Sequence, residues 1–431
     1  MKSGFNARSV GVAIGGIGLI AAGSVAATGT PAAAAGNGGR LVYVAQPPHA
    51  KATALAGKVS PSLTPSQCLA ATDGEFACHD PASIHAAYDI PSTVDGQPAG
   101  AGKTIVIVDA FGSPTAADDL AAFDDSFGLP APPSFQIVYP QGKPTFQGTD
   151  NQLGWAEESS LDVQWAHAVA PGANIVLDVA VTNYGDALNN AVKYAVDHHL
   201  GDVISMSYGE PEADIHGDST QQNQAHQIFQ SASDAGITLL ASSGDDGSDN
   251  AAGTANFGYP ASDPLVTAVG GTNLWKGSGL SQPDETVWGD FTSCPTSCAD
   301  GPFGATGGAP SLLTAKQGSD VSYNASVYTG VLTYLGFLGP DNNGLYFFGG
   351  TSAGSPQWAG IVSIVDQARG SDIGQLNPHL ASLAATGALS DVTQGDNQTP
   401  TFSGGFSAGP GHDIPTGYGS PDAAKLIAAL S

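Results

Sequence analysis

The strands that this sequence predicts are runs of consecutive apolar residues rather than alternating ones. Residues 104–109 read Thr-Ile-Val-Ile-Val-Asp, a run rich in β-branched side chains. Similar runs stand at residues 174–180, 203–207, 237–242 and 265–269. A strand that is apolar on both sides is typical of a parallel sheet buried between two layers of helices.

Segments with a helical spacing of apolar residues separate these runs. They cover residues 115–127, 153–168, 185–198 and 222–235. Strands that alternate with helices predict an α/β fold with a mostly parallel sheet and helices on both faces. The functional site of such a fold lies beyond the carboxyl ends of the strands, so we expect the chemistry in residues that follow a strand.

The N-terminus has the pattern of an export signal. Lys2 and Arg8 precede a small, weakly apolar stretch at residues 10–27, and four alanines at residues 32–35 stand before Gly36. This pattern predicts a signal peptide over residues 1–35, with an uncleaved membrane anchor as the alternative. No later stretch of the sequence is apolar for long enough to span a bilayer. We therefore expect a secreted, extracellular protein without a membrane partner after cleavage.

The chain after the signal divides into two parts. Residues 36–85 are rich in Ala, Pro and Ser with little periodicity, which predicts an extended N-terminal arm or a short pro-segment. Residues 86–431 hold the alternating strands and helices and would form one domain. A hydrophobic content of 41% with 58 glycines is typical of a globular chain.

Acidic residues strongly outnumber basic ones. The 39 Asp and Glu against 12 Lys and Arg give a net charge of −27. Such a surface repels nucleic acid and anionic membranes, which excludes those partners. It suits an acidic medium, because the carboxylates are neutralised there and few basic groups remain to repel one another. A soluble exported protein of any function is the plainer interpretation of the charge.

The four cysteines form two local pairs, Cys68 with Cys78 and Cys294 with Cys298. An exported chain favours two short disulfide loops. A zinc site is the alternative, but His79 is the only histidine near either pair at a ligand spacing.

A candidate nucleophile stands where a predicted helix begins. Residues 349–356 read Gly-Gly-Thr-Ser-Ala-Gly-Ser-Pro and lead into an apolar, helix-forming run at residues 357–365. Ser352 then lies at a helix N-terminus, where unpaired N–H groups and the helix dipole favour negative charge. Pro356 falls in the first turn, where a missing N–H costs little. The position suits a nucleophile, although Ser is also an ordinary helix cap.

Two carboxyl groups lie on one face of an earlier predicted helix. Residues 155–162 read Trp-Ala-Glu-Glu-Ser-Ser-Leu-Asp, so Glu158 and Asp162 are four residues apart and close enough to share a proton. Glu157 has Leu161 at that spacing. Two carboxyls that close do not both ionise easily, so one keeps its proton while the other serves as a base at acidic pH. The alternative is a solvated acidic helix face.

A third carboxyl follows a strand. The run at residues 237–242 continues into Ser-Gly-Asp-Asp-Gly, which places Asp245 at a strand's carboxyl end. As a neutral acid, Asp245 could donate its O–H to the oxyanion of a serine hydrolase, whereas an Asp-capped turn is the everyday alternative. A histidine base of the subtilisin type, within His-Gly-Thr, is missing. The one His-Gly pair stands at residues 216–217, before Asp218, in a polar segment.

These stretches resemble the three signatures of the sedolisin (serine-carboxyl peptidase) family of the subtilisin-like superfamily, in the family's order. Residues 259–262 and 266–272 resemble a fourth block, and the resemblance covers residues 87–431. It implies a subtilisin-like α/β fold. It also implies a role for each candidate residue. Ser352 would be the nucleophile and Glu158 the general base and then acid. Asp162 would orient Glu158, and Asp245 would donate to the oxyanion.

Two further roles come from the same resemblance. Asp109, at the end of the first strand, would extend the carboxyl relay, with a strand-end turn residue as the alternative. Residues 205–209 read Ser-Met-Ser-Tyr-Gly and resemble the family's substrate-binding strand, which would hold a peptide by backbone pairing.

The C-terminal region resembles the family's calcium site. The resemblance lies in Asp-Val at residues 391–392 and in the Gly-rich stretches at residues 408–413 and 416–421. It implies one structural Ca²⁺. The carboxylates of Asp391 and Asp413 would bind it together with the backbone carbonyls of Val392, Gly409 and Gly411, and water would complete the shell. Without the resemblance, a Gly-rich turn would be the better interpretation.

Together these observations predict a secreted, acid-acting serine-carboxyl endopeptidase that forms an acyl-enzyme on Ser352 and acts, as a monomer, on protein or peptide substrates. Two rivals stay open. One is a neutral Ser-His-Asp hydrolase of the same fold, with a His such as His167 and an Asp such as Asp109; the other is a non-catalytic exported binding module. The pH profile separates the first rival, because a His base works near neutrality. Residues 36–85 depart from the family, whose precursors usually carry a large folded pro-domain.

Overall fold

The computed structural model describes residues 43, 49–51, 64–72, 74–215, 219–290, 304–400 and 402–431. Three of the predictions lie outside these residues: the signal peptide, the pairing of Cys294 with Cys298, and the His-Gly pair at residues 216–217. In the part of the chain that the structure describes, no helix has the length and apolar content needed to cross a membrane.

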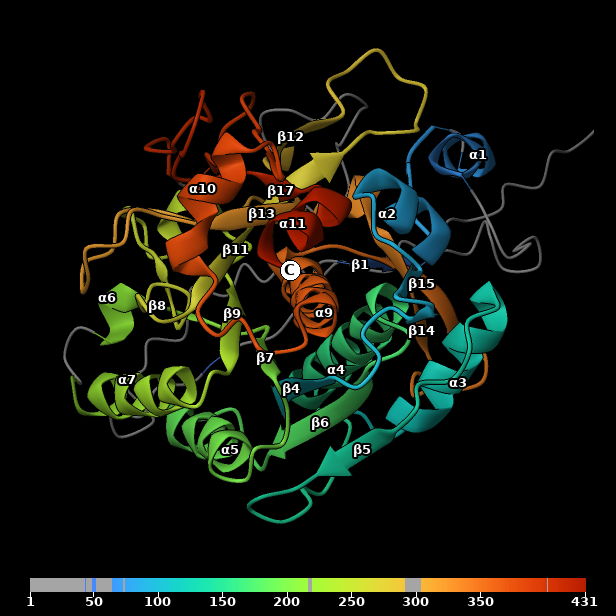
Figure 1. The fold of residues 1–431 in the computed structure, drawn as a ribbon, viewed down its shortest axis with the longest axis vertical. Coiled ribbons are helices and arrows are strands. Elements are labelled where there is room, and N and C mark those ends of the chain that lie inside the picture. Colours follow the sequence, from blue (N-terminus) through green and yellow to red (C-terminus); the bar gives the residue numbers. More distant parts are fainter. Residues whose placement is uncertain are drawn as a thin grey trace, which may run out of the picture. The chain divides into compact units, whose positions relative to one another are not determined.

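A central sheet organises the domain, with strand order β5-β6-β4-β7-β9-β11-β12 and with β13 on β11 (Figure 1). The strands are β4 (Thr104–Ala110), β5 (Phe135–Val138), β6 (Asn174–Ala180), β7 (Val203–Met206), β9 (Thr238–Ser242), β11 (Thr267–Leu274), β12 (Glu285–Val287) and β13 (Val321–Asn324). All neighbours run parallel except β12, which is antiparallel to β11. The predicted mostly parallel sheet is confirmed, and each of the five apolar runs contributes a strand to it.

The side chains of β4 show why its run is apolar throughout. Ile105 and Ile107 pack into one hydrophobic core, and Val106 and Val108 pack into another. The first core includes side chains of α3 (Ala116–Phe127), α4 (Asp150–Val169) and α9 (Thr351–Arg369), and the second those of α5 (Gly185–Asp197) and α7 (Ser219–Asp234). Helices therefore cover both faces of the sheet, as predicted.

Helices α4 and α9 lie side by side at the centre of Figure 1. Both are buried on all sides, α4 over residues 158–169 and α9 over residues 351–366, so neither has the one-sided apolar stripe of a surface helix. They approach closely at Gly360, where an added Cβ would lie 2.7 Å from Cγ1 of Val169. A residue without a side chain at this point lets the helix that carries Ser352 rest on the helix that carries Glu158.

The predicted N-terminal arm contacts the domain at several points. β1 (His49–Lys51) pairs antiparallel with β15 (Gly344–Phe348), which also pairs with β14 (Val331–Leu335). A disulfide joins Cys68 of α1 (Pro65–Ala71) to Cys78, with Cα atoms 5.7 Å apart. The structure therefore contains the first of the two predicted disulfides.

Short elements complete the fold. They are α2 (Pro81–Ala87), α6 (Glu212–Ile215), α10 (Leu380–Ala385), α11 (Ala423–Leu430), the pairs β2 (Thr93–Val94) with β3 (Gln97–Pro98), β8 (Glu210–Pro211) with β10 (Gly258–Tyr259) and β16 (Leu389–Ser390) with β17 (Ser420–Pro421), and 3-10 turns at Gly247–Asp249, Val327–Thr329 and Asn377–His379. Since α2 spans the boundary predicted after residue 85, the division into arm and domain stays a prediction.

Candidate active site

Three fully buried carboxyl groups meet where α4 passes the carboxyl end of β4. Glu158 and Asp162 come from successive turns of α4, and Asp109 comes from the end of β4. Burial raises the pKa of Glu158 well above its ordinary value, and the charges of Asp162 and Asp109 raise it further. Burial, then the charge of Asp109, does the same to the pKa of Asp162. The spacing predicted from the sequence therefore does place the two carboxyl groups next to one another, and sharing of a proton between them stays a prediction.

Asp109 joins this cluster from the sheet. Burial raises its pKa to about 7, and the nearby Ser159 hydroxyl, which donates to the Trp155 carbonyl at 2.9 Å, opposes the rise. Asp109 is also within Coulombic range of both other carboxyls. Each of the three carboxyls therefore lies close enough to another for the charge of one to influence the ionisation of its neighbours.

Ser352 stands on the first turn of α9 and is 6% exposed. Its hydroxyl interacts with the Glu158 carboxyl and lowers the pKa of that group, although neither Glu158 oxygen has a partner at regular hydrogen-bond geometry among the described residues. Ser207 links the two helices, because its Oγ donates to the Ser352 carbonyl over 3.4 Å and its hydroxyl lowers the pKa of Asp162. The nucleophile candidate thus faces the carboxyl cluster directly.

Asp245 reaches the same place from the loop after β9. Its Oδ1 accepts hydrogen bonds from the backbone N–H of Thr351 at 2.7 Å and from the Thr351 hydroxyl at 2.8 Å. Burial raises the pKa of Asp245 to about 6 in spite of these two bonds. Since Oδ1 is the acceptor for both, a proton on this carboxyl resides on Oδ2, where it can be donated to a bound substrate.

The rival base, His167, lies elsewhere on α4. Its Nε2 is 2.8 Å from the Pro130 carbonyl oxygen and 3.2 Å from Asp124, and its side chain is fully buried. The four predicted catalytic residues therefore come together, with Asp109, and His167 does not join them.

Sequence reasoning missed two polar groups close to this site. Asp178 points from β6 into the core on the other face of the sheet, and burial raises its pKa to about 8. Neither oxygen of Asp178 has a hydrogen-bond partner among the described residues, and the same holds for Nε1 of the fully buried Trp155. An Asp inside the apolar run at residues 174–180 was the available signal for the first of them.

The residues predicted to bind calcium gather in the loops beside β16 and β17. Asp391 Oδ2 accepts from the Gly411 N–H at 2.8 Å, and Asp413 Oδ2 accepts from the Gly409 N–H at 3.1 Å. Burial raises the pKa of Asp413, and the charge of Asp391 adds to the rise, so the two carboxylates lie close together. The carbonyls of Val392, Gly409 and Gly411 accept no hydrogen bond from other described residues. Two adjacent carboxylates with three unengaged carbonyls fit a hard cation such as Ca²⁺.

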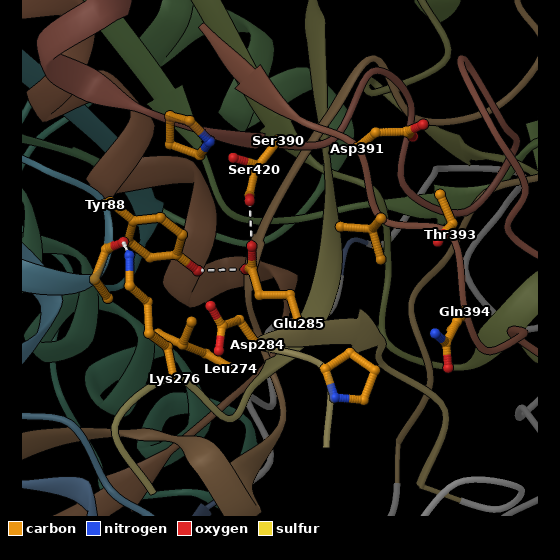
Figure 2. Close-up of a pocket in the computed structure, with 14 residues that line it drawn as sticks. Tyr88, Leu274, Lys276, Asp284, Glu285, Ser390, Asp391, Thr393, Gln394 and Ser420 are labelled. Carbon is orange, nitrogen blue, oxygen red and sulfur yellow. Dashed lines mark hydrogen bonds between the residues drawn. The ribbon is translucent and has the colours of Figure 1, made fainter. Parts of the chain in front are cut away.

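A cavity of about 260 Å³ adjoins these loops. Figure 2 shows Glu285 at its centre, where the Tyr88 hydroxyl donates to Oε1 at 2.9 Å and the Ser420 hydroxyl donates to Oε2. Asp391 lines the far side of the cavity. Since the four predicted catalytic residues are not among those that line it, the cavity belongs to the C-terminal region and not to the carboxyl cluster.

Comparison with known proteins finds relatives of this chain in sequence and in fold. The model of the subtilase family matches residues 148–399. Kumamolisin of Bacillus sp. (strain MN-32) is 32% identical over 377 residues, which cover 82% of this chain and 63% of that protein. Sedolisin of Pseudomonas sp. (strain 101) is 32% identical over 382 residues, which cover 82% of this chain and 61% of that protein. The chain therefore spans less than two thirds of the length of these relatives.

A solved structure of Pseudomonas sedolisin, complexed with two molecules of pseudo-iodotyrostatin, superposes with a TM-score of 0.70. The two chains are 30% identical, and the match covers 82% of this chain and 97% of that one. Nearly the whole length of the sedolisin chain therefore has a counterpart in this fold.

The buried carboxyls predict that the protein is most stable in acid. The pKa of Asp178 is about 8 and that of Asp109 about 7 in the folded chain, against an ordinary value of 3.8. Between about pH 4 and these values the unfolded chain releases protons that the folded chain keeps, so stability falls by ~1.4 kcal/mol per group and per pH unit. Chemical denaturation at pH 4 to 8 should show this decline.

Asp178→Asn should flatten that decline, because an amide does not titrate, whereas the exposed Asp125→Asn should leave it unchanged. An equally steep decline in both variants would show that Asp178 does not carry its proton in the folded state.

Proposed function

This chain belongs to the sedolisin branch of the subtilase family, and from that premise we propose that it is an acid-acting serine-carboxyl endopeptidase, cleaving protein or peptide substrates through an acyl-enzyme on Ser352. The observation that carries the proposal is the approach of the Ser352 hydroxyl to the carboxyl of Glu158, which is buried beside Asp162. The activity and substrates of this chain are proposals and are not taken over from its relatives, since the chain spans only part of their length.

In the proposed reaction Ser352 attacks the scissile carbonyl while Glu158 accepts the hydroxyl proton. Burial and mutual repulsion raise the pKa of both Glu158 and Asp162 and oppose their ionising together, so the proposed base is the pair after it has lost one of its two protons. Asp162 stabilises and orients Glu158, and Asp109 extends the relay. Glu158 then returns the proton to the leaving amine, and the same steps with water release the acyl group.

Asp245 supplies the oxyanion donor in this proposal. Thr351 holds Oδ1 by two hydrogen bonds, which leaves Oδ2 to carry the proton that the tetrahedral oxyanion needs. Because the pKa of Asp245 is about 6, this proton is present below that pH and is lost above it. The ionised carboxylate would repel the oxyanion, which limits the reaction to acidic pH.

The proposal includes two further properties of the protein, a bound calcium ion and secretion. We propose one structural Ca²⁺ held by Asp391, Asp413 and the three unengaged carbonyls, where it would neutralise the two carboxylates and join the loops that carry them. We also propose that the protein is secreted, since the Cys68–Cys78 disulfide suits an oxidising compartment.

The nucleophile is tested by Ser352→Ala, with Ser363→Ala as its control. Ser363 is a buried serine of the same helix whose hydroxyl donates to the Gly360 carbonyl at 2.7 Å. Ser352→Ala should lower hydrolysis of a protein substrate at pH 3 to 5 by at least ~10³-fold with unchanged circular dichroism, and Ser363→Ala and His167→Ala should not. Wild-type rates in Ser352→Ala, or inactivation by His167→Ala, would exclude the proposed mechanism.

The oxyanion role is tested by two substitutions of Asp245. Asp245→Asn keeps a neutral donor that cannot ionise, so it should retain part of the activity and move the alkaline limb of the pH profile upward. Asp245→Ala should lose ~10² to 10³ in rate at every pH without such a shift. Asp234→Asn, at an exposed position at the end of α7, is the control. Identical pH profiles for the Asn and Ala variants would remove Asp245 from the mechanism.

Calcium removal tests the C-terminal site. A chelator should lower the melting temperature, because a ligand that binds only the folded state stabilises it by ~2.7 kcal/mol at a hundredfold excess over Kd. Asp391→Ala should lower the melting temperature by itself and abolish the response to the chelator. An unchanged wild-type melting temperature, with metal loss verified by elemental analysis, would count against the site.

A further inference from the structure

The ammonium group of Lys316 is held inside the protein rather than at its surface. Only 8% of the Lys316 side chain is exposed. The whole chain has 12 lysines and arginines against 39 acidic residues, so basic groups are scarce and this one is withdrawn from solvent. A buried ammonium needs an acceptor for each of its three protons, because burial disfavours a charge that is not compensated. The atoms around Lys316 meet this need.

Oxygen atoms surround the Lys316 ammonium. Its Nζ donates to the carbonyl oxygens of Ala261 at 2.6 Å and of Val266 at 2.7 Å, and it lies 2.7 Å from Oδ2 of Asp320. The Asp263 carbonyl oxygen is a fourth, longer contact at 3.4 Å. The three short contacts use all three protons of the ammonium. We call these four oxygen atoms the oxygen cage.

Lys316 reaches the oxygen cage from a strap formed by residues 310–317, whose ends pair with one another. The strap leaves Leu312 51% exposed while it buries the Lys316 side chain, which reverses the usual preference of these two residue types. The Thr314 hydroxyl donates to the Ser262 carbonyl at 3.0 Å, so a second bond fastens the strap to the loop that forms the cage. Polar contacts to this loop therefore position the lysine.

The oxygen cage has the chemistry of a site for a monovalent cation. Backbone carbonyls that converge on one point can replace the hydration shell of an ion such as K⁺. Asp320 supplies the single carboxylate of the cage, which balances one positive charge rather than two. The short contacts of 2.6 to 2.7 Å lie at or beyond the upper end of the range of about 2.3 to 2.6 Å over which oxygen binds Ca²⁺. A singly charged ion of the size of ammonium fits these features best.

We propose that the oxygen cage is a monovalent-cation site that Lys316 fills with its own ammonium group. The proposal goes beyond the proposed function and does not depend on it, since none of the cage oxygens belongs to a catalytic candidate. Asp320 lies directly before β13, and its Oδ2 also accepts from the Ala268 N–H of β11 at 2.7 Å. The built-in cation thus joins the strap and the loop after β10 to the central sheet. The wild-type chain needs no external ion here, whereas a chain without this ammonium should bind one.

Lys316→Met tests the site, because it removes the ammonium and keeps the side chain as far as Cε. At pH 5 and constant ionic strength, ammonium chloride replaces tetramethylammonium chloride, whose cation is too large for the cage. Ammonium should raise the melting temperature of the full Lys316→Met chain by about 2 °C at a tenfold excess over Kd, since an ion bound only by the folded state stabilises it. It should not raise that of the wild-type chain, whose cage is filled.

Lys193→Met is the matched control. The Lys193 ammonium pairs with Asp197 at the surface, and 54% of its side chain is exposed. The melting temperature of this variant should respond to ammonium as that of the wild-type chain does. An equal rise in all three chains, or no rise in a folded Lys316→Met chain, overturns the proposal.

A second measurement decides the matter if Lys316→Met does not fold. A variant that folds only when ammonium is present supports the proposal. If it folds under neither condition, the wild-type chain is treated by reductive methylation and its lysines are followed by mass spectrometry. Lys316 should stay unmodified under conditions that modify Lys193, because its ammonium is enclosed by the cage oxygens. Modification of both lysines at the same rate contradicts the proposal.

Discussion

A carboxyl group that is buried without a cationic partner has to hold a proton, and the centre of this molecule is built around that constraint. Glu158, Asp162 and Asp109 are fully buried next to one another, and Asp178 lies alone on the other face of the sheet. No lysine or arginine appears among the groups that shift their pKa values. Desolvation and mutual repulsion therefore outweigh every hydrogen bond that favours the charged forms, and the folded chain takes up protons that the unfolded chain would release.

The same physical effect serves stability and the proposed chemistry. A proton kept on Asp245 is the oxyanion donor, and a proton shared by Glu158 and Asp162 gives a base that works in acid. The net charge of −27 also favours an acidic medium, since the repulsion among surface carboxylates is relieved as the pH falls. A histidine base would instead favour activity at a higher pH, because only its neutral form accepts a proton and that form requires a higher pH. His167 is instead held by the Pro130 carbonyl and Asp124.

Packing of the two central helices sets how closely the reacting groups approach. α4 and α9 are buried on all sides, and the contact of Gly360 with Val169 leaves no room for a side chain between them. Ser207 and Thr351 then connect this helix pair to the strand ends, through bonds to the Ser352 carbonyl and to Asp245. The carboxyl cluster is thus held by a buried helix and a strand end, which favours preorganised electrostatics.

Local patterns in the sequence determined the features that depend on neighbouring residues. The apolar runs predicted the strands because both faces of the sheet are covered, and the spacing of Glu158 and Asp162 placed their carboxyls together because a helix repeats every 3.6 residues. Ser352 was predicted at a helix start from its flanking glycines and proline. Only the tertiary structure decided which distant groups join them. The burial that raises the pKa of Asp178 and the approach of Thr351 to Asp245 both depend on segments far apart in the chain, and such contacts follow from packing rather than from any local pattern.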